Sequence, residues 1–315
     1  MAQLANSFST FTAIGLRESL ADAIYNISPE ETPFLSAIGK GKASAVFEEW
    51  QTDALAAAAN NKVEQGNEAT VSALTPTVRV GNRTQISEKV YAVTGTEEKV
   101  SKAGRKSEIA YQDAKKMVEL KRDVEFGALQ NTTAIAAAAG VPGQSRGVLG
   151  WIATNTNHDA VLPGADPNPI TNTAPTDGTT RVLTEDMLKD VGQQCWTSGG
   201  NPTMLFVPAS LRALVSGFTG AATKFEDVKK KQITATAEVY VGDFGRYSIV
   251  NSRYQRERDV FLIQPDMWEL LTLRPMQGSD LAKTGDSRKR MVNTEYTLKA
   301  KNEAANGAIR DLKAA

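Results

Sequence analysis

Cysteine and histidine are almost absent from this 315-residue chain, which has one of each. A single cysteine, Cys195, cannot form a disulfide within the chain, which fits a reducing compartment. Zinc sites built from cysteine and histidine are excluded by the count. His158 lies in residues 154–180, a stretch rich in Asn, Thr, Pro, Asp and Gly that is typical of a loop, whereas Cys195 ends a helical pattern. Nothing local orients these two side chains as a nucleophile and its base, so we do not expect them to act together.

The chain also lacks an excess of charge and a long apolar run. Its 36 basic and 36 acidic residues cancel, whereas a protein that grips nucleic acid through phosphate neutralisation usually has a basic excess or a basic face. The short basic clusters at 224–231 and 287–290 are diluted by acids, which is typical of solvated surface. No apolar run reaches 18 residues, and the N-terminus has no secretory signal pattern. We therefore expect a protein that is made and used without crossing a membrane.

Three short strings imitate catalytic motifs without their companions. Residues 243–245 read Asp-Phe-Gly as in kinases, but no His-Arg-Asp loop or glycine-rich phosphate loop accompanies them. In residues 278–287 the lysine precedes the second glycine, so this is not a phosphate loop. The serine in residues 140–147 lacks the spacing of a nucleophile elbow. We predict no catalytic residue, no cofactor and no metal site, although an enzyme that uses carboxylates on the same scaffold remains an alternative.

The stretch NISPEETPFLSAIGKGKA, residues 26–43, is apolar but cut into short pieces by prolines and glycines. Ser28, Pro29 and Glu31 form a capping-box start, and the piece from Pro33 to Ile38 ends before a glycine. Neither piece reaches the roughly 12 to 15 residues that an isolated helix needs in water. Both must pack on something else, which is either the core of the same chain or another molecule.

Two segments, residues 43–55 and 77–95, predict a long two-stranded arm around the small, polar stretch AAAANNKVEQGNEAT. The alternation of the second segment places Val78, Val80, Thr84, Ile86 and Val90 on one face and Arg79, Arg83, Gln85 and Lys89 on the other. An isolated hairpin is only marginally stable in water. The arm therefore requires an external surface, unless it is an ordinary hairpin of a larger sheet.

The longest helix signal runs over residues 107–130, with good helix formers, no proline and one late glycine. After residue 180 the pattern becomes mixed, with a helix from about Thr184, a buried strand at 204–208, a helix at 209–218, a hairpin around 243–245, strands near 259–265 and 267–275, and a last strand at 290–302. Helices and strands interleave without a regular βαβ repeat, so the predicted fold class is α+β.

The order of these parts resembles the major capsid proteins of tailed bacteriophages. The strings that carry the resemblance are SPEETPFLSAIGK, EEWQTDALAAA, NRTQISEKVYAVTGT, AGRKSEIAYQDAKKMVELKRDVE and LAKTGDSRKRMVNTEYTLKAKNE. They occur in this order, and the resemblance as a whole extends over residues 17–312. The resemblance implies the Johnson fold, also called the Hong Kong 97-like fold. It implies an N-terminal arm (1–41), an extended loop (42–96), a peripheral domain with a spine helix (97–180), an axial domain (181–264) and a return to the peripheral domain (265–315).

The function implied by the resemblance is that of a structural subunit that assembles with its own copies, as pentamers and hexamers, into an icosahedral head around double-stranded DNA. The DNA would be enclosed without sequence preference, and portal, scaffold and decoration proteins are further candidate partners. The protein would be made in the host bacterial cytoplasm and end in the virion. An encapsulin-type compartment shell is the alternative, because it shares the fold.

Contact candidates follow from segments that have no local core. The expected apolar anchors between subunits are Tyr25, Phe34, Leu35 and Trp50, and the expected ionic partners on the polar face of the hairpin are Arg79, Arg83 and Lys89.

Overall fold

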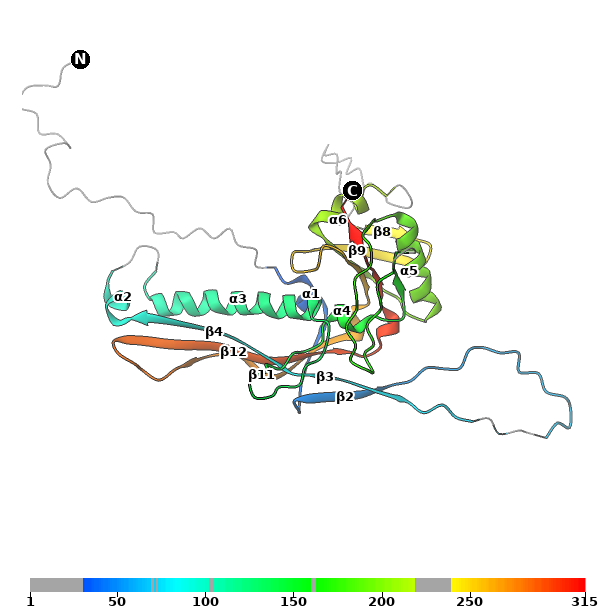
Figure 1. Ribbon diagram of the computed structural model, residues 1–315, viewed down its shortest axis with the longest axis horizontal. Helices are drawn as coiled ribbons and strands as arrows, with labels where there is room; N and C mark the ends of the chain where they lie inside the picture. Colours follow the sequence, from blue (N-terminus) through cyan, green and yellow to red (C-terminus); the bar gives the residue numbers. More distant parts are fainter. Residues whose placement is uncertain are drawn as a thin grey trace, which may run out of the picture.

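A 23-residue helix, α3 (Glu108–Gln130), is the longest helix of the described chain and lies along a four-stranded sheet (Figure 1). The computed structural model describes residues 31–68, 71, 73–101, 105–159, 163–218 and 239–314. Ser107 caps the helix, since its side chain accepts a hydrogen bond from the backbone N–H of Ala110 at 3.2 Å. The helix predicted over residues 107–130 is confirmed, and among the described residues no helix is long and apolar enough to cross a membrane.

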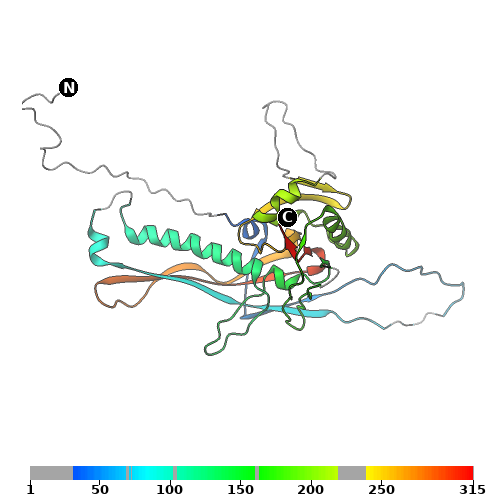
Figure 2. The same cartoon turned by 45° about the horizontal axis from the view of Figure 1, so that its top comes forward.

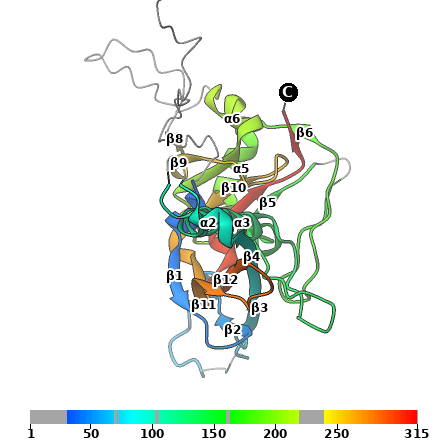
Figure 3. The same ribbon diagram turned by 90° about the vertical axis from the view of Figure 1, so that its left-hand side faces the viewer.

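The four-stranded sheet combines segments that lie far apart in the sequence. Its strands, in spatial order, are β1 (Gly39–Lys42), β11 (Trp268–Asp280), β12 (Ser287–Ala300) and β4 (Gln85–Thr94). The pairs β11–β12 and β12–β4 are antiparallel, whereas β1 joins β11 in parallel. Viewed along α3, the helix covers one face of this sheet (Figure 3).

A six-stranded sheet forms the second half of the molecule. Its strands, in spatial order, are β5 (Thr156–Asn157), β13 (Gly307–Ile309), β10 (Val260–Ile263), β7 (Met204–Pro208), β9 (Gly245–Ser252) and β8 (Val239–Gly242). Helices α5 (Glu185–Thr197) and α6 (Ala209–Ser216) pack on it. The smaller elements are α2 (Gly95–Lys99), α4 (Val148–Trp151), the 3₁₀ turns Pro265–Met267 and Glu303–Ala305, and the pair β6 (Arg181–Val182) with β14 (Leu312–Lys313).

One apolar core joins the two halves. The ring of Phe34 in α1 (Pro33–Ala37) is fully buried, with its centroid 5.8 Å from the ring of Phe206 in β7 and 6.0 Å from that of Trp268 in β11. Leu129 near the end of α3 and Trp151 in α4 belong to the same cluster. Because residues from α1, α3 and both sheets share this core, the start of the described chain is part of the subunit's own interior.

Strands β2 (Phe47–Thr52) and β3 (Val78–Arg83) form a separate antiparallel ribbon. The described chain between them, residues 53–68, 71 and 73–77, extends away from both sheets in the two views of Figures 1 and 2. The predicted arm is therefore present, but its second segment divides at Thr84 into β3, which pairs with β2, and β4, which belongs to the larger sheet.

The α+β class, the strand at 204–208 and the hairpin around 243–245 are confirmed. Within residues 265–315, β11 and β12 belong to the four-stranded sheet beside α3, whereas β13 pairs with β10 and β5 in the six-stranded sheet. The sequence pattern also did not predict β1. Its residues, Gly-Lys-Gly-Lys, have no strand preference of their own, and β1 is a strand because it pairs with β11.

Candidate intersubunit surface

The inner face of the β2–β3 ribbon is fixed to its own subunit. Trp50 donates from Nε1 to the backbone oxygen of Ala300 at 2.8 Å, and its ring centroid lies 5.4 Å from that of Trp151. Asn82 is fully buried and donates from Nδ2 to the backbone oxygens of Arg146 and Leu298. The base of the ribbon is therefore held to its own subunit by buried hydrogen bonds.

The outer face of the ribbon carries charge and one aromatic ring. Arg79 forms an ion pair with Glu49 across the two strands. The guanidinium of Arg83 stands 4.8 Å from the ring centroid of Phe47. Gly81 allows this arrangement, because a Cβ there would lie 2.7 Å from Cζ of Phe47. Phe47 can thus cross β3 and present its ring beside Arg83.

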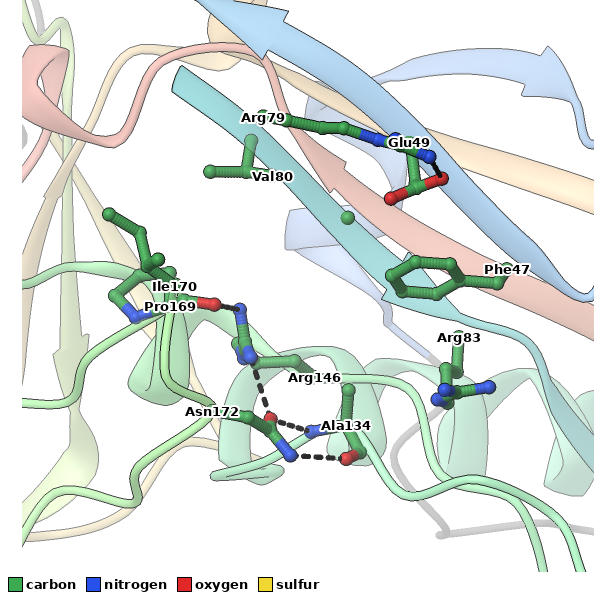
Figure 4. Close-up of a pocket in the computed structure, with 11 residues that line it drawn as sticks. Phe47, Glu49, Arg79, Val80, Arg83, Ala134, Arg146, Pro169, Ile170 and Asn172 are labelled. Atoms are coloured by element: carbon green, nitrogen blue, oxygen red, sulfur yellow. Dashed lines mark hydrogen bonds and ion pairs between the residues drawn. The ribbon is translucent and has the colours of Figure 1, made fainter.

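A cavity of about 400 Å³ lies between this face and the loops after α3 (Figure 4). Its lining comprises Phe47, Glu49, Arg79, Val80, Gly81 and Arg83 from the ribbon and Ala134, Arg146, Pro169, Ile170 and Asn172 from the loops. We call this cavity the ribbon-base pocket.

Arg146 forms the floor of the ribbon-base pocket. It donates from Nη1 to the backbone oxygen of Pro169 at 3.0 Å and from Nη2 to Oδ1 of Asn172 at 2.6 Å, and its guanidinium stands 4.7 Å from the ring centroid of Trp151. Burial lowers the pKa of Arg146 to about 10, so the group remains charged at neutral pH. Asn172 in turn bonds to both backbone groups of Ala134. The two loops are therefore held in place around a fixed positive charge.

Two of the expected anchors are corrected by their burial. Phe34 is 0% exposed and Leu35 is 5% exposed, and both pack in the core of their own subunit. The backbone N–H groups of these two residues donate to the carboxylate of Glu125 on α3, at 2.9 and 2.8 Å. The prolines and glycines around α1 shorten the helix, but α3 and β7 supply the surface on which it packs.

Trp50 and Lys89 also have partners within their own subunit. The indole of Trp50 packs inward, as described above, and Nζ of Lys89 pairs with Asp123 of α3 at 2.6 Å. Arg79 and Arg83 remain on the outer face, although Arg79 is paired with Glu49. Tyr25 lies outside the described residues.

The alternation predicted for β4 is correct, but the face that turns inward is the polar one. Ile86 and Val90 are 55% and 52% exposed, whereas Lys89 faces α3. An apolar pair is thus left open on the far face of the four-stranded sheet, opposite the spine helix.

His158 ties the loop 154–180 to the end of the chain. Its Nε2 lies 2.8 Å from Oδ1 of Asp166, and its Nδ1 lies 3.1 Å from Oδ2 of Asp311. The hydrogen bond to Asp166 is the main cause of a raised pKa at His158. Asp311 also accepts the backbone N–H of Gly178, so both ends of the loop are held.

Neither His158 nor Cys195 forms part of a recognisable catalytic arrangement in the described chain. Cys195 is buried, and burial raises the pKa of its thiol to about 12, which disfavours the nucleophilic thiolate. Within the described ranges, no group of three or more His, Cys, Asp or Glu side chains is placed to hold a metal ion. The distinctive surface of the described chain is therefore the projecting ribbon and the pocket at its base.

The model of the SU10 major capsid protein family matches residues 3–313. The chain belongs to this family. It is a major capsid protein, a subunit of a viral shell, as the resemblance noted in the sequence implied.

Relatives and solved structures agree with this assignment. The capsid protein is 27% identical over 337 residues to the major capsid protein of Escherichia phage Phieco32, covering 96% of each chain. A chain of the capsid asymmetric unit of cyanophage A-1(L) superposes with a TM-score of 0.68 at 13% identity, covering 98% of this chain and 99% of that one. A Mycobacterium phage Adephagia chain gives 0.61 at 9% identity, covering 97% and 98%. These likenesses show the Johnson fold (Hong Kong 97-like).

An encapsulin shares the fold as well. A chain of the holo-SrpI encapsulin complex from Synechococcus elongatus PCC 7942 superposes on the capsid protein with a TM-score of 0.57 at 8% identity, covering 95% of this chain and 93% of that one. The fold is thus common to viral and compartment shells, and the family match distinguishes between them.

Sequence reasoning missed the loop half of the ribbon-base pocket. Arg146 lies in residues 140–147, which resemble a nucleophile elbow only superficially, and Ile170 and Asn172 lie in a stretch whose composition is typical of a loop. One local signal could have indicated the pocket. Gly81 and Asn82 interrupt a strand pattern of β-branched residues, and a glycine inside a strand often marks a place where another group approaches the backbone closely.

Proposed function

We propose that the capsid protein assembles with its own copies, as pentamers and hexamers, into an icosahedral head that encloses double-stranded DNA. The observation that carries this proposal is the described part of segment 53–77, which projects from the base of the ribbon with Leu55, Val63, Val71 and Leu74 exposed to solvent. A subunit with such a segment gains stability when a neighbour covers it, and a closed lattice repeats the gain at every interface.

The proposed division of labour follows the two sheets. The proposed arm and loop are shorter than the expected ranges 1–41 and 42–96, because β1 and β4 belong to the four-stranded sheet and α1 packs in the core. The residues before α1 act as the N-terminal arm, and β2, β3 and the chain between them act as the extended loop. The spine helix with the four-stranded sheet acts as the peripheral domain, and most of residues 181–264 act as the axial domain around the fivefold and sixfold axes. The near-zero net charge fits a wall that encloses DNA without gripping it.

Further partners follow from the same role. Portal, scaffold and decoration proteins would contact the assembled lattice, synthesis would take place in the host bacterial cytoplasm, and the finished subunit would belong to the virion. An encapsulin-type compartment, the alternative expected from the shared fold, has the fold likeness behind it and the family match against it.

The contents of native particles separate the two candidates. Particles isolated from the organism that makes this chain would be treated with nuclease, opened and analysed for DNA and for protein. Nuclease-protected double-stranded DNA inside icosahedral particles is the expected result. Particles that contain a cargo enzyme and no protected DNA would contradict the proposal and support a compartment shell.

A further inference from the structure

Residues 163–178 form a strap that is fastened at its stem and at its tip. At the stem, Gly178 donates its backbone N–H to Oδ1 of Asp311 at 2.6 Å, and at the tip, Asn172 accepts from Arg146 at 2.6 Å. Asn172 (φ 56°) and Asp311 (φ 58°) are the two non-glycine residues with positive φ in the part of the chain that the structure describes. Side chains other than glycine rarely adopt this left-handed conformation, which persists where surrounding contacts hold it. Both fastenings therefore depend on the contacts around them.

At the stem, His158 lies between two carboxylates. Its Nε2 lies 2.8 Å from Oδ1 of Asp166, which belongs to the strap, and its Nδ1 lies 3.1 Å from Oδ2 of Asp311, near the end of the chain. A carboxylate oxygen can only accept a hydrogen bond, so each contact requires an N–H on the ring nitrogen. A neutral imidazole has one N–H, whereas the imidazolium has two. Both contacts are therefore favourable only when His158 is protonated on both nitrogens.

Other charged groups also surround His158. Besides the two carboxylates they are Asp159, Arg181 of β6, Asp190 of α5, Arg258 before β10 and Arg310 after β13. Arg310 opposes the imidazolium, but the hydrogen bond to Asp166 outweighs it and is the main cause of the raised pKa of His158. The imidazolium therefore persists above the usual pKa of about 6.5.

The carboxylate of Asp311 is firmly held. Its side chain is 2% exposed, and besides His158 it bonds to Gly178 and pairs with Arg258 at 3.5 Å. When His158 loses one proton, we expect the remaining N–H to stay on this buried carboxylate, because an unpaired buried charge is costly.

The carboxylate of Asp166 is held less firmly. Its side chain is 34% exposed, and its other partners are the hydroxyl of Thr156 at 2.8 Å and Nε of Arg310 at 3.7 Å. After deprotonation the lone pair on Nε2 of His158 would face the carboxylate of Asp166. Two acceptors at this distance repel each other, and the side chain of Asp166 can turn into solvent.

We propose that His158 and Asp166 form a pH-operated latch, in which the imidazolium holds the first half of the strap closed and its deprotonation releases that half. The second half stays in place, because Asp177 pairs with Arg256 at 2.6 Å and with Arg258 at 3.3 Å. The latch is closed below the folded pKa of His158 and opens as pH rises through it. Every contact in the latch lies within one subunit, so this inference does not depend on the proposed assembly.

The protonation of the latch can be measured directly, because His158 is the single histidine of the chain. With isotope-labelled histidine, a nuclear magnetic resonance titration of dissociated subunits reports His158 without overlap. The position of the strap is followed by the fluorescence anisotropy of a dye attached to Ala165→Cys, an exposed position next to Asp166, whereas Cys195 is buried and stays unlabelled. Anisotropy should fall between about pH 6 and about pH 9, with the midpoint of the histidine titration. The ratio of open to closed strap should rise by up to about tenfold per pH unit, because one proton is linked to opening.

Two variants in the labelled chain distinguish the latch from a general effect of pH. Asp166→Asn keeps the shape of the side chain, and its amide can accept from the imidazolium or donate to the neutral ring, so the strap should stay closed over the whole range. His158→Asn removes the imidazolium, so the strap should be open over the same range.

Three results would overturn the inference. The first is an anisotropy that stays constant while His158 titrates, and the second is a fall in anisotropy that persists in Asp166→Asn. The third is a pKa of His158 at or below about 6.5, because the two carboxylates would then not hold the imidazolium.

Discussion

Replacing Phe34 with alanine tests whether the start of the described chain belongs to its own subunit. The ring is 0% exposed and meets Phe206 and Trp268 edge to face, at centroid distances of 5.8 and 6.0 Å. Removal of a fully buried phenylalanine ring costs about 3 to 5 kcal/mol, and each aromatic pair accounts for about 0.5 to 1.5 kcal/mol beyond its buried area. We expect Phe34→Ala to lower the free energy of unfolding of the unassembled subunit by about 4 kcal/mol.

The assay is urea unfolding of dissociated subunits, followed by tryptophan fluorescence. Trp268 contacts Phe34 directly, so its emission reports the loss of packing. Phe34→Leu is the matched control, because it keeps most of the volume and should cost less than about 1.5 kcal/mol. An unchanged unfolding curve for Phe34→Ala, together with a loss of assembly, would refute the reasoning and restore Phe34 as an anchor between subunits.

Three further changes test other contacts. Glu125→Gln should lower the free energy of unfolding by about 1.5 to 3 kcal/mol, because the glutamine amide has one oxygen in place of the two carboxylate oxygens that accept backbone hydrogen bonds at the start of α1. Urea titration measures this loss, and an unchanged free energy of unfolding would contradict the contact. Trp50→Phe should lower the free energy of unfolding by about 1 kcal/mol in the same assay, because it removes the indole hydrogen bond to Ala300. A defect in assembly without this loss of stability would indicate that Trp50 acts between subunits. The raised pKa of His158 means that its bonds to Asp166 and Asp311 contribute fully below the unfolded value of about 6.5 and are lost as pH rises through the folded pKa. The urea midpoint should therefore decline as pH rises above about 6.5, and His158→Asn should remove this decline.

Local elements were predictable because their signals are local. The cap at Ser107 and the uninterrupted helix formers behind it determine where α3 begins, and the buried run at 204–208 forms a strand as expected. The turn at 243–245 likewise joins two strands. In each case the residues that determine the structure lie within a few positions of one another.

Long-range partners account for what the sequence did not predict. Phe34 and Leu35 are buried because Glu125, some 90 residues away, accepts the hydrogen bonds of their backbone. Ile86 and Val90 remain open because β4 turns its polar face to α3, where Asp123 pairs with Lys89. Alternation indicates which residues share a face, and only the tertiary partner decides which face is buried.

The ribbon-base pocket was beyond sequence reasoning for the same reason. Its two walls come from β2 with β3 and from loops that follow α3, and they meet because Asn82 is bonded to Arg146. No spacing in the sequence connects these segments. Of the seven expected contact residues, Arg83 is the one that the structure leaves on an open surface without a partner carboxylate among the described residues.

The central claim is that this chain is a shell subunit whose projecting loop is stabilised by neighbouring copies. The most direct measurement is electron microscopy of the purified full chain, combined with light scattering to determine particle size. Closed polyhedral particles, or rings of five and six subunits that close when conditions change, are the predicted result. A monomer or small dimer under every condition would contradict the account, because the exposed loop would then have no neighbouring copy to cover it.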